Sequence, residues 1–344
     1  MPSIKDVAKL AGVSPMTASR VINESGQVSM KMKLRVMRAV KQLGYRPNFN
    51  ARSLRVQKSR LFGLILPDIE NPLFASLAKH VEVAANNHGY NVMVGTTWED
   101  RHKEREYLEL MISRQIEGMI ISPSSEENVD AFLNCPIPVA LLDRKLPGAS
   151  HIPSLTVDNM EIGRLAARHL LSLGHRHFAC IAGPQSIELF TERANGFRQE
   201  LAAAGRAVEA CVTAKDMNEL SKIELGPRYL YEIMERCSAM PVGLFCANDL
   251  AALGAMQAAH KLKLAVPGQL SIVGVDDIPA CKLTTPTLTS IAQPMARIAS
   301  EGVKLLIDRL HDSECRPGNV VLQPELIVRE STARTTNASR KIHL

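Results

Sequence analysis

The segment IKDVAKLAGVSPMTASRVIN, residues 4–23, sets the architecture of the N-terminal part of the chain. Its apolar residues follow helical spacing up to Ala11, and Gly12 then ends the helix in a turn. Ser14 is a good helix N-cap, and Pro15 suits the first helical position because proline has no amide hydrogen to leave unpaired. The segment therefore predicts two short helices joined by a glycine-containing turn.

A third helix is expected from about Met30 to Leu43, with apolar residues that include Leu34 and Met37. Two short helices braced by a third form a helix-turn-helix, whose second helix lies in the major groove of DNA. On that second helix, Arg20 can bond bidentately to guanine and Met16 can contact a thymine methyl group. Short polar side chains that reach phosphates or base edges are Ser14, Thr17, Ser19 and Asn23. Any short basic bundle exposes arginine, so the ordered set carries this prediction rather than one residue.

The charge of the chain is divided unevenly. Residues 1–60 hold 13 Lys/Arg and 2 Asp/Glu, whereas the remainder holds 28 basic and 33 acidic side chains. A basic head on a mildly acidic body is the electrostatic footprint of a protein that binds a polyanion.

Several other signals point to a protein of the reducing cytoplasm. The chain has no apolar signal-peptide core and no run of about 18 apolar residues that would span a membrane. Its seven cysteines are scattered, and no pair has C-x-x-C spacing. We therefore expect neither a disulfide framework nor a metal site.

The segment that follows the head is short and basic. Residues 50–56, NARSLRV, contain one prominent apolar side chain, Leu54. A helix of seven residues is marginal alone, but it could fold on meeting DNA and insert Leu54 between base steps in the minor groove. The alternative is an ordinary interdomain linker.

After Arg60, short apolar strands alternate with helices. The series begins with an expected strand at residues 61–66, and it restarts with a helix at 162–173 and a strand at 177–182. Such alternation predicts parallel sheets covered on both faces, here in two similar lobes. In sheets of this kind, ligands bind at the carboxyl ends of the strands.

Candidate binding residues stand at those strand ends. They are Asp68, Asp143, Asn248 and Asp276, together with Arg193, which is expected to open the helix after Ala182-Gly183-Pro184. Carboxylates, an amide and a guanidinium in one cleft can bind adjacent hydroxyl groups. Phe74 or Phe190 can cover the apolar face of a sugar. Asp249 and Asp277 are interpreted instead as helix or turn caps.

The head strongly resembles that of LacI/GalR-type repressors. The resemblance rests on residues 4–23, on GYRPN at 44–48 and on ARSL at 51–54. It covers the chain to about Arg334, and the sequence pattern is most similar to that of ribose and purine repressors. It implies a homodimer on double-stranded DNA at a pseudo-palindromic operator. It also implies base contacts from Pro15, Met16 and Arg20, phosphate contacts from Thr17 and Ser19, and hinge contacts from Leu54 and Arg55.

The same resemblance implies a fold and a domain organisation. The fold is an all-α helix-turn-helix head followed by an α/β periplasmic-binding-protein-like core of two doubly wound parallel-sheet lobes. The expected parts are the head at 1–48, a hinge helix or linker at 49–60, the core at 61–334 and a polar tail at 335–344; lobe 1 takes about 61–160 and 292–322, and lobe 2 about 161–291 and 323–334. The tail has no leucine heptads, so a dimer is expected rather than a tetramer.

For the effector, the resemblance favours Arg193, Asn248 and Asp276 as contacts, and Asp68, Phe74 and Asp143 match less specific positions. Purine repressors carry extra polar contacts where this chain has Ile187 and Leu189. A carbohydrate-type effector is therefore favoured. The alternative is a regulator that depends on a nucleoside, purine or sugar-acid corepressor.

Two other classes of function, an enzyme and a sugar-binding protein, fit the sequence less well. The chain has no G-x-G-x-x-G, P-loop, H-E-x-x-H or G-x-S-x-G motif, and the adjacent Asp276 and Asp277 side chains would diverge on an extended backbone. We therefore expect no enzyme and no cofactor. A cytoplasmic sugar-binding protein without DNA function would suit the body but not the basic head. A steep salt dependence of duplex binding separates these classes.

Overall fold

The computed structural model describes residues 2–22, 28–45, 59–149, 151–312 and 318–335. The chain divides into two compact units, Met1–Ser59 and Arg60–Leu344. Three of the predicted DNA contacts, Asn23, Leu54 and Arg55, lie outside the described residues. Within the described ranges, no helix is long and apolar enough to cross a lipid bilayer.

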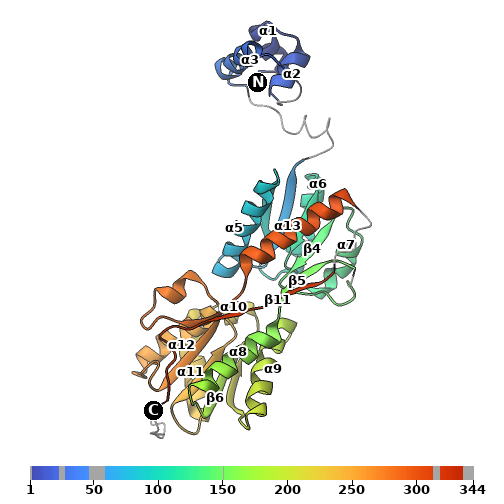
Figure 1. Ribbon diagram of the computed structural model, residues 1–344. Coiled ribbons are helices and arrows are strands. Elements are labelled where there is room, and N and C mark those ends of the chain that lie inside the picture. Colours follow the sequence, from blue (N-terminus) through green and yellow to red (C-terminus); the bar gives the residue numbers. More distant parts are fainter. Residues whose placement is uncertain (1, 23–27, 46–58, 150, 313–317, 336–344) are drawn as a thin grey trace. The chain divides into compact units, whose positions relative to one another are not determined.

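The described part of the N-terminal unit holds three helices: α1 (Ile4–Ala11), α2 (Pro15–Ile22) and α3 (Met30–Leu43) (Figure 1). A capping box starts α1, because the Ser3 hydroxyl accepts from the Asp6 amide while the Asp6 carboxylate accepts from the Ser3 amide. The three predicted helices and the all-α character of the head are confirmed.

Small side chains fill the interior of this unit. The buried residues are Val7, Ala8, Ala11, Ala18, Val21, Val36 and Ala39. Leu34 and Met37, two apolar residues of the predicted third helix, are 54% and 48% exposed. The buried stripe of α3 runs through Val36 and Ala39, and helical geometry turns Leu34 and Met37 away from that stripe.

Two six-stranded sheets organise the second unit. The first sheet has the order β11-β5-β4-β3-β1-β2 and is parallel throughout. Its strands are β1 (Leu61–Leu66), β2 (Asn91–Thr96), β3 (Gly118–Ile121), β4 (Val139–Leu142), β5 (Ser154–Val157) and β11 (Val320–Leu322).

The second sheet has the order β12-β10-β9-β8-β6-β7, and its only antiparallel pairing within the described chain joins β12 to β10. Its strands are β6 (His177–Ala182), β7 (Val208–Thr213), β8 (Val242–Cys246), β9 (Leu270–Asp276), β10 (Thr289–Ala292) and β12 (Glu325–Ile327). Both sheets contain the 2-1-3-4-5 order of a doubly wound fold, which confirms the predicted fold class.

Helices cover the sheets of both lobes (Figure 1). In the first lobe they are α5 (Pro72–Asn87), α6 (Arg101–Ser113), η1 (Glu126–Asn128) and α7 (Val129–Leu133). In the second they are α8 (Asn159–Ser172), α9 (Glu188–Ala203), α10 (Met217–Leu220), η2 (Ile223–Leu225), α11 (Gly226–Arg236), α12 (Asp249–Lys261) and η3 (Pro279–Lys282). The chain changes lobe between β5 and α8, between β10 and α13 (Met295–His311), and between β11 and β12; α13 packs on α5 and the first sheet.

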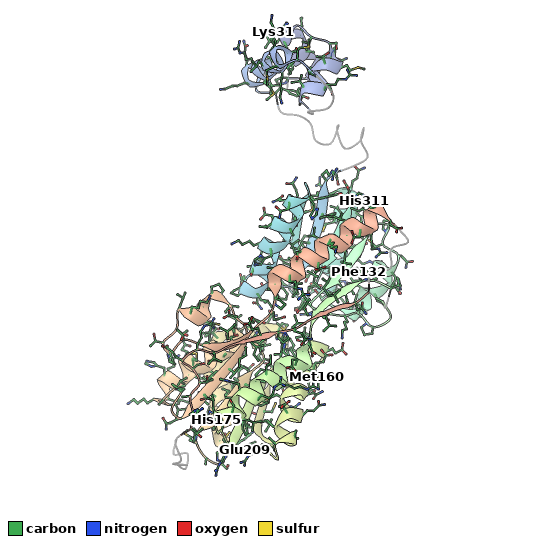
Figure 2. All side chains as sticks on the ribbon, in the orientation of Figure 1. Lys31, Phe132, Met160, His175, Glu209 and His311 are labelled. Atoms are coloured by element: carbon green, nitrogen blue, oxygen red, sulfur yellow. The ribbon has the colours of Figure 1, made fainter. Side chains whose placement is uncertain are left out.

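The helices α8 and α9 approach each other closely at two glycines. A Cβ atom on Gly163 would stand 2.0 Å from the carbonyl oxygen of Arg193, and one on Gly196 would stand 2.0 Å from that of Met160. Met160 lies near the N-terminal end of α8 (Figure 2). This contact brings Arg193 beside Asn159, whose Oδ1 accepts from Arg193 Nε at 2.9 Å.

Candidate functional site

The helix α2 presents the predicted base-reading side chains at its surface. Ser14, Pro15, Met16 and Arg20 are exposed, and Met16 retains 65% of its accessible area. The Ser14 hydroxyl accepts from the Thr17 amide at 3.1 Å and contacts the Thr17 hydroxyl at 2.9 Å, so Ser14 caps α2 as predicted. Thr17 is half-buried. The exposed surface of α2 therefore combines one long cation, one flexible apolar side chain and a proline without an amide donor.

The turn before α2 is held in place from both sides. Gly12 has φ +62°, a conformation that favours glycine, and the Val13 amide donates to the Ala8 carbonyl at 3.0 Å. From α3, Arg35 donates to the Gly12 carbonyl at 3.4 Å. Ser19, the remaining predicted phosphate contact in the described part of the head, is half-buried on α2. The head is thus one braced unit.

Five of the six predicted effector residues line a single small cavity between the lobes. They are Phe74 and Asp143 from the first lobe and Arg193, Asn248 and Asp276 from the second. The cavity measures only about 20 Å³. It shares Asp143 with a hollow of about 330 Å³ and Phe74 with another of about 490 Å³, so the three spaces adjoin.

Asp68 stands in the 490 Å³ hollow, outside the small cavity. Its Oδ1 accepts from the Glu70 amide at 2.8 Å, which shapes the turn after β1. The structure therefore brings five of the six candidates together and leaves Asp68 at the margin.

Arg193 is a buried cation of the cleft that several contacts hold in place. It is 3% exposed, donates to the Ala247 carbonyl from Nη1 at 2.8 Å, and lies over the Phe190 ring at 5.4 Å. The expectation that Arg193 opens its helix is wrong. Since α9 begins at Glu188, Arg193 lies in its second turn. The first turn holds the Glu188 carboxylate, which interacts favourably with the positive end of the helix dipole.

Asn248 has two roles that the sequence does not separate. Its Oδ1 accepts from the Ala251 amide at 2.9 Å and caps α12. Its Nδ2 is buried and has no hydrogen-bond partner within the described chain. An unpaired buried donor costs roughly 1–3 kcal/mol, so a ligand oxygen at this point would relieve that cost.

Asp276 ends β9 in an unusual environment. It has φ +111°, is 9% exposed, and accepts from Gln293 Nε2 at 2.7 Å. Burial raises the pKa of this carboxyl to about 8, even though Arg193 acts in the opposite direction. A carboxyl that keeps its proton near neutral pH can donate to a ligand hydroxyl as well as accept from one.

The raised pKa of Asp276 predicts a pH dependence of stability. Because the native carboxyl binds its proton more tightly than the unfolded one, this contribution is full below about pH 4 and is lost as pH rises through about 8. We expect the free energy of unfolding to fall by about 2 kcal/mol between pH 6 and 8 from this group. The variant Asp276→Asn keeps an Oδ1 acceptor for Gln293 and should flatten that slope in denaturant titrations. An equal slope in both proteins would contradict the assignment.

The interpretation of Asp249 as a cap is wrong. Asn248 caps the helix, and the Asp249 carboxylate instead accepts from the Ile278 amide at 2.9 Å and the Ser290 hydroxyl at 2.7 Å. Asp277 occupies a turn position with φ +51° and accepts from Arg329 at 2.5 Å. Both groups stabilise the strand ends that carry the cleft.

Sequence reasoning missed an ion pair on the first-lobe side. Arg144 Nη2 lies 2.5 Å from Glu99 Oε1, and both side chains are mostly buried. Arg144 Nε has no hydrogen-bond partner within the described chain. Trp98, Glu99 and Asp143 all have φ between 54° and 65°, and such strained backbone gathers at binding sites. The sequence signal that could have located this part of the site was the single tryptophan, Trp98, which lies just after β2.

The larger hollows carry an acidic lining. Five carboxylates surround the 330 Å³ hollow, against the two cations Arg144 and Lys145. The carboxylates are Glu99, Asp143, Glu188, Glu192 and Asp216. This field opposes the entry of anions. Within the described residues, no group of three or more His, Cys, Asp or Glu side chains could hold a metal ion.

Comparisons with known proteins cover both units. Residues 3–48 match the family model described as bacterial regulatory proteins, lacI family, and residues 167–332 match a periplasmic binding protein-like domain. The ribose operon repressor of Halalkalibacterium halodurans is 33% identical over 98% of this chain and 99% of its own length.

Two solved structures are similar along nearly the whole chain. One is the lac repressor dimer bound to operator and the anti-inducer ONPF, with a TM-score of 0.83 and 27% identity over 96% of this chain and 99% of that one. The other is the complex of the transcriptional regulator CelR with cellobiose, with a TM-score of 0.70 and 28% identity over 96% of this chain and 100% of that one.

Proposed function

Because this chain belongs to the lacI family of bacterial regulatory proteins and is a DNA-binding transcriptional regulator with an effector-binding domain, we propose that it is a cytoplasmic repressor controlled by a small neutral carbohydrate. The observation that carries the effector assignment is the cavity that joins Arg193, Asn248 and Asp276 to Asp143 and Phe74. This regulatory function requires no catalytic step by the chain.

Operator recognition is assigned to the exposed surface of α2. Arg20 reads guanine, and Met16 contacts a thymine methyl group, since Pro15 offers no polar group for base readout. The remaining basic side chains of the head supply the grip on phosphates, which does not depend on sequence. A homodimer places two such heads on two half-sites, in keeping with the lac repressor dimer found as a structural neighbour.

The chemistry of the cleft supports a neutral polyhydroxylated effector. Asn248 Nδ2 offers an unpaired donor, Arg193 is a donor held in position, and the Asp276 carboxyl can give or take a hydrogen bond. Phe190 and Trp98 provide aromatic surface for the C–H face of a sugar ring.

The acidic lining argues against a sugar acid or a sugar phosphate. A negatively charged effector would have to enter past the carboxylates that surround the 330 Å³ hollow. Ile187 and Leu189 line the same hollow and offer a base no polar side-chain contact, which disfavours a purine.

The effector is proposed to control DNA binding by closing the two lobes about the three crossovers that join them. Closure of the lobes on an effector would move the N-terminal lobes of a dimer against each other and change the spacing of the heads. A coupling free energy of about 1–3 kcal/mol would change operator affinity roughly 5–150-fold.

A thermal-shift screen tests the effector class. At an effector concentration of 100 times Kd, stabilisation is about 2.7 kcal/mol, which corresponds to a rise of several degrees in Tm for a chain of this size. We expect neutral mono- or disaccharides to give this shift, and the matching sugar phosphates, uronic acids and nucleosides to give none. A larger shift with a phosphate or uronic acid would refute the charge argument, and a larger shift with a nucleoside would replace the carbohydrate assignment.

A further inference from the structure

Two cysteines face each other across neighbouring strands of the second sheet. Cys180 on β6 is in register with Cys211 on the edge strand β7. The Cys180 thiol donates to Cys211 Sγ at 2.8 Å. Neighbouring strands lie about 4.8 Å apart, which falls within the Cα separations that a disulfide spans. A bond between the two sulfurs therefore needs side-chain adjustment but no change in strand pairing.

A guanidinium completes the cluster. Arg198 Nη2, on α9, donates to Cys211 Sγ at 3.4 Å from an exposed side chain. Cys211 is half-buried, whereas Cys180 is 1% exposed. The hydrogen bond from Cys180 lowers the pKa of Cys211 to about 6 against the effect of burial, and Arg198 acts in the same direction. The cluster thus pairs a half-buried thiol of lowered pKa with a buried thiol that donates to it.

The other described cysteines lack this arrangement. Cys237, Cys246 and Cys281 are buried, and burial raises the pKa of each thiol. Cys135 is half-buried like Cys211, but burial raises its pKa as well. Low thiol pKa, access to solvent and a neighbouring second thiol are the combination that reacts with peroxides.

We propose that Cys211 and Cys180 form a dithiol site that reacts with hydroperoxides to give an intrachain disulfide. The Cys211 thiolate attacks one peroxide oxygen, the O–O bond breaks, and the other oxygen leaves as water or an alcohol after taking up a proton. The Cys180 sulfur then attacks the Cys211 sulfenic acid, the S–S bond forms, and the departing hydroxide takes the Cys180 proton to give water. The two sulfurs together lose two electrons, and the hydroperoxide gains them.

The site is separate from the ligand cleft. Glu209, near the start of β7, lies at the end of the second lobe farthest from the first lobe (Figure 2). Neither thiol lines the three cavities of the cleft. The dithiol chemistry can therefore be measured without an effector.

Peptide mapping of the full-length protein tests the proposal. The reduced protein is treated with one equivalent of hydrogen peroxide, alkylated, digested without reductant and analysed by mass spectrometry. We expect a peptide pair linked through Cys180 and Cys211, formed at least about tenfold faster than Cys135 is oxidised. The proposal fails if both cysteines are recovered alkylated, or if Cys135 reacts at the same rate as Cys211.

Three variants sharpen the result. Cys135→Ser is the matched control and should leave the cross-link unchanged. Cys180→Ser should leave Cys211 as a sulfenic acid that dimedone traps, and Arg198→Gln should slow the cross-link about threefold or more because the thiolate loses its cation. An unchanged rate of cross-linking in Arg198→Gln would show that the guanidinium does not activate Cys211. Because Arg198 is exposed, this variant gives a result even if Cys180→Ser does not fold.

Discussion

Arg193→Ala is expected to abolish the effector response while operator binding without effector stays within about twofold of the unmodified protein. Charge-assisted hydrogen bonds contribute about 1.5–3 kcal/mol each, so the loss of this donor should weaken effector binding roughly 10-fold to 150-fold. The measurement pairs calorimetric titration of the effector with fluorescence anisotropy on operator DNA, both before and after effector addition.

The fold of this variant needs its own control. Removal of Arg193 leaves the Asn159 amide oxygen and the Ala247 carbonyl without their donor, which should cost roughly 2–3 kcal/mol of stability. Arg198→Ala removes an exposed arginine from the same helix and should leave the effector response intact. If Arg193→Ala folds, binds operator and still responds to effector normally, the pocket assignment is wrong.

Among substitutions in the head, Arg20→Ala is expected to weaken operator binding the most. A bidentate contact to guanine provides about 1–3 kcal/mol of discrimination, and a dimer makes it twice, so operator affinity should fall roughly 30-fold to 20,000-fold. Half-sites are first selected from a random duplex library, and Kd is then measured on the selected and on a scrambled duplex over a range of salt concentrations.

Arg38→Ala is the matched control, since it removes one exposed positive charge from α3. Both variants should reduce the salt dependence of binding to a similar extent, because each loses one cation. Only Arg20→Ala should reduce the ratio between the Kd values for the scrambled and the selected duplex. Equal losses on the two duplexes would show that Arg20 contacts phosphate alone.

The head could be predicted almost entirely from sequence. The bounds of α1, α2 and α3 follow from short-range signals such as Gly12 at a left-handed position and Ser14 at an N-cap. The inward direction of side chains was less predictable. Leu34 and Met37 are apolar but exposed, because the narrow interior between three short helices is filled by valine and alanine.

For the cleft, the sequence predicted the positions of the residues but not their roles. Strand ends located Asp143, Asn248 and Asp276, since every parallel strand delivers its carboxyl end to the same edge of its sheet. Their roles depended on partners distant in the chain. Asp276 keeps its proton because burial outweighs the pull of Arg193, and neither effect is visible in the local sequence.

Local sequence was therefore sufficient for the helix-turn-helix, the basic charge of the head and the two α/β lobes, because caps, turns and strand-helix alternation are written in short stretches of chain. The folded chain alone established that Asn248 caps a helix while leaving one donor unpaired, that Arg144 pairs with Glu99, and that two cysteines 31 residues apart touch. These features arise where segments remote in sequence are packed together, and burial there changes what each side chain can bind or donate.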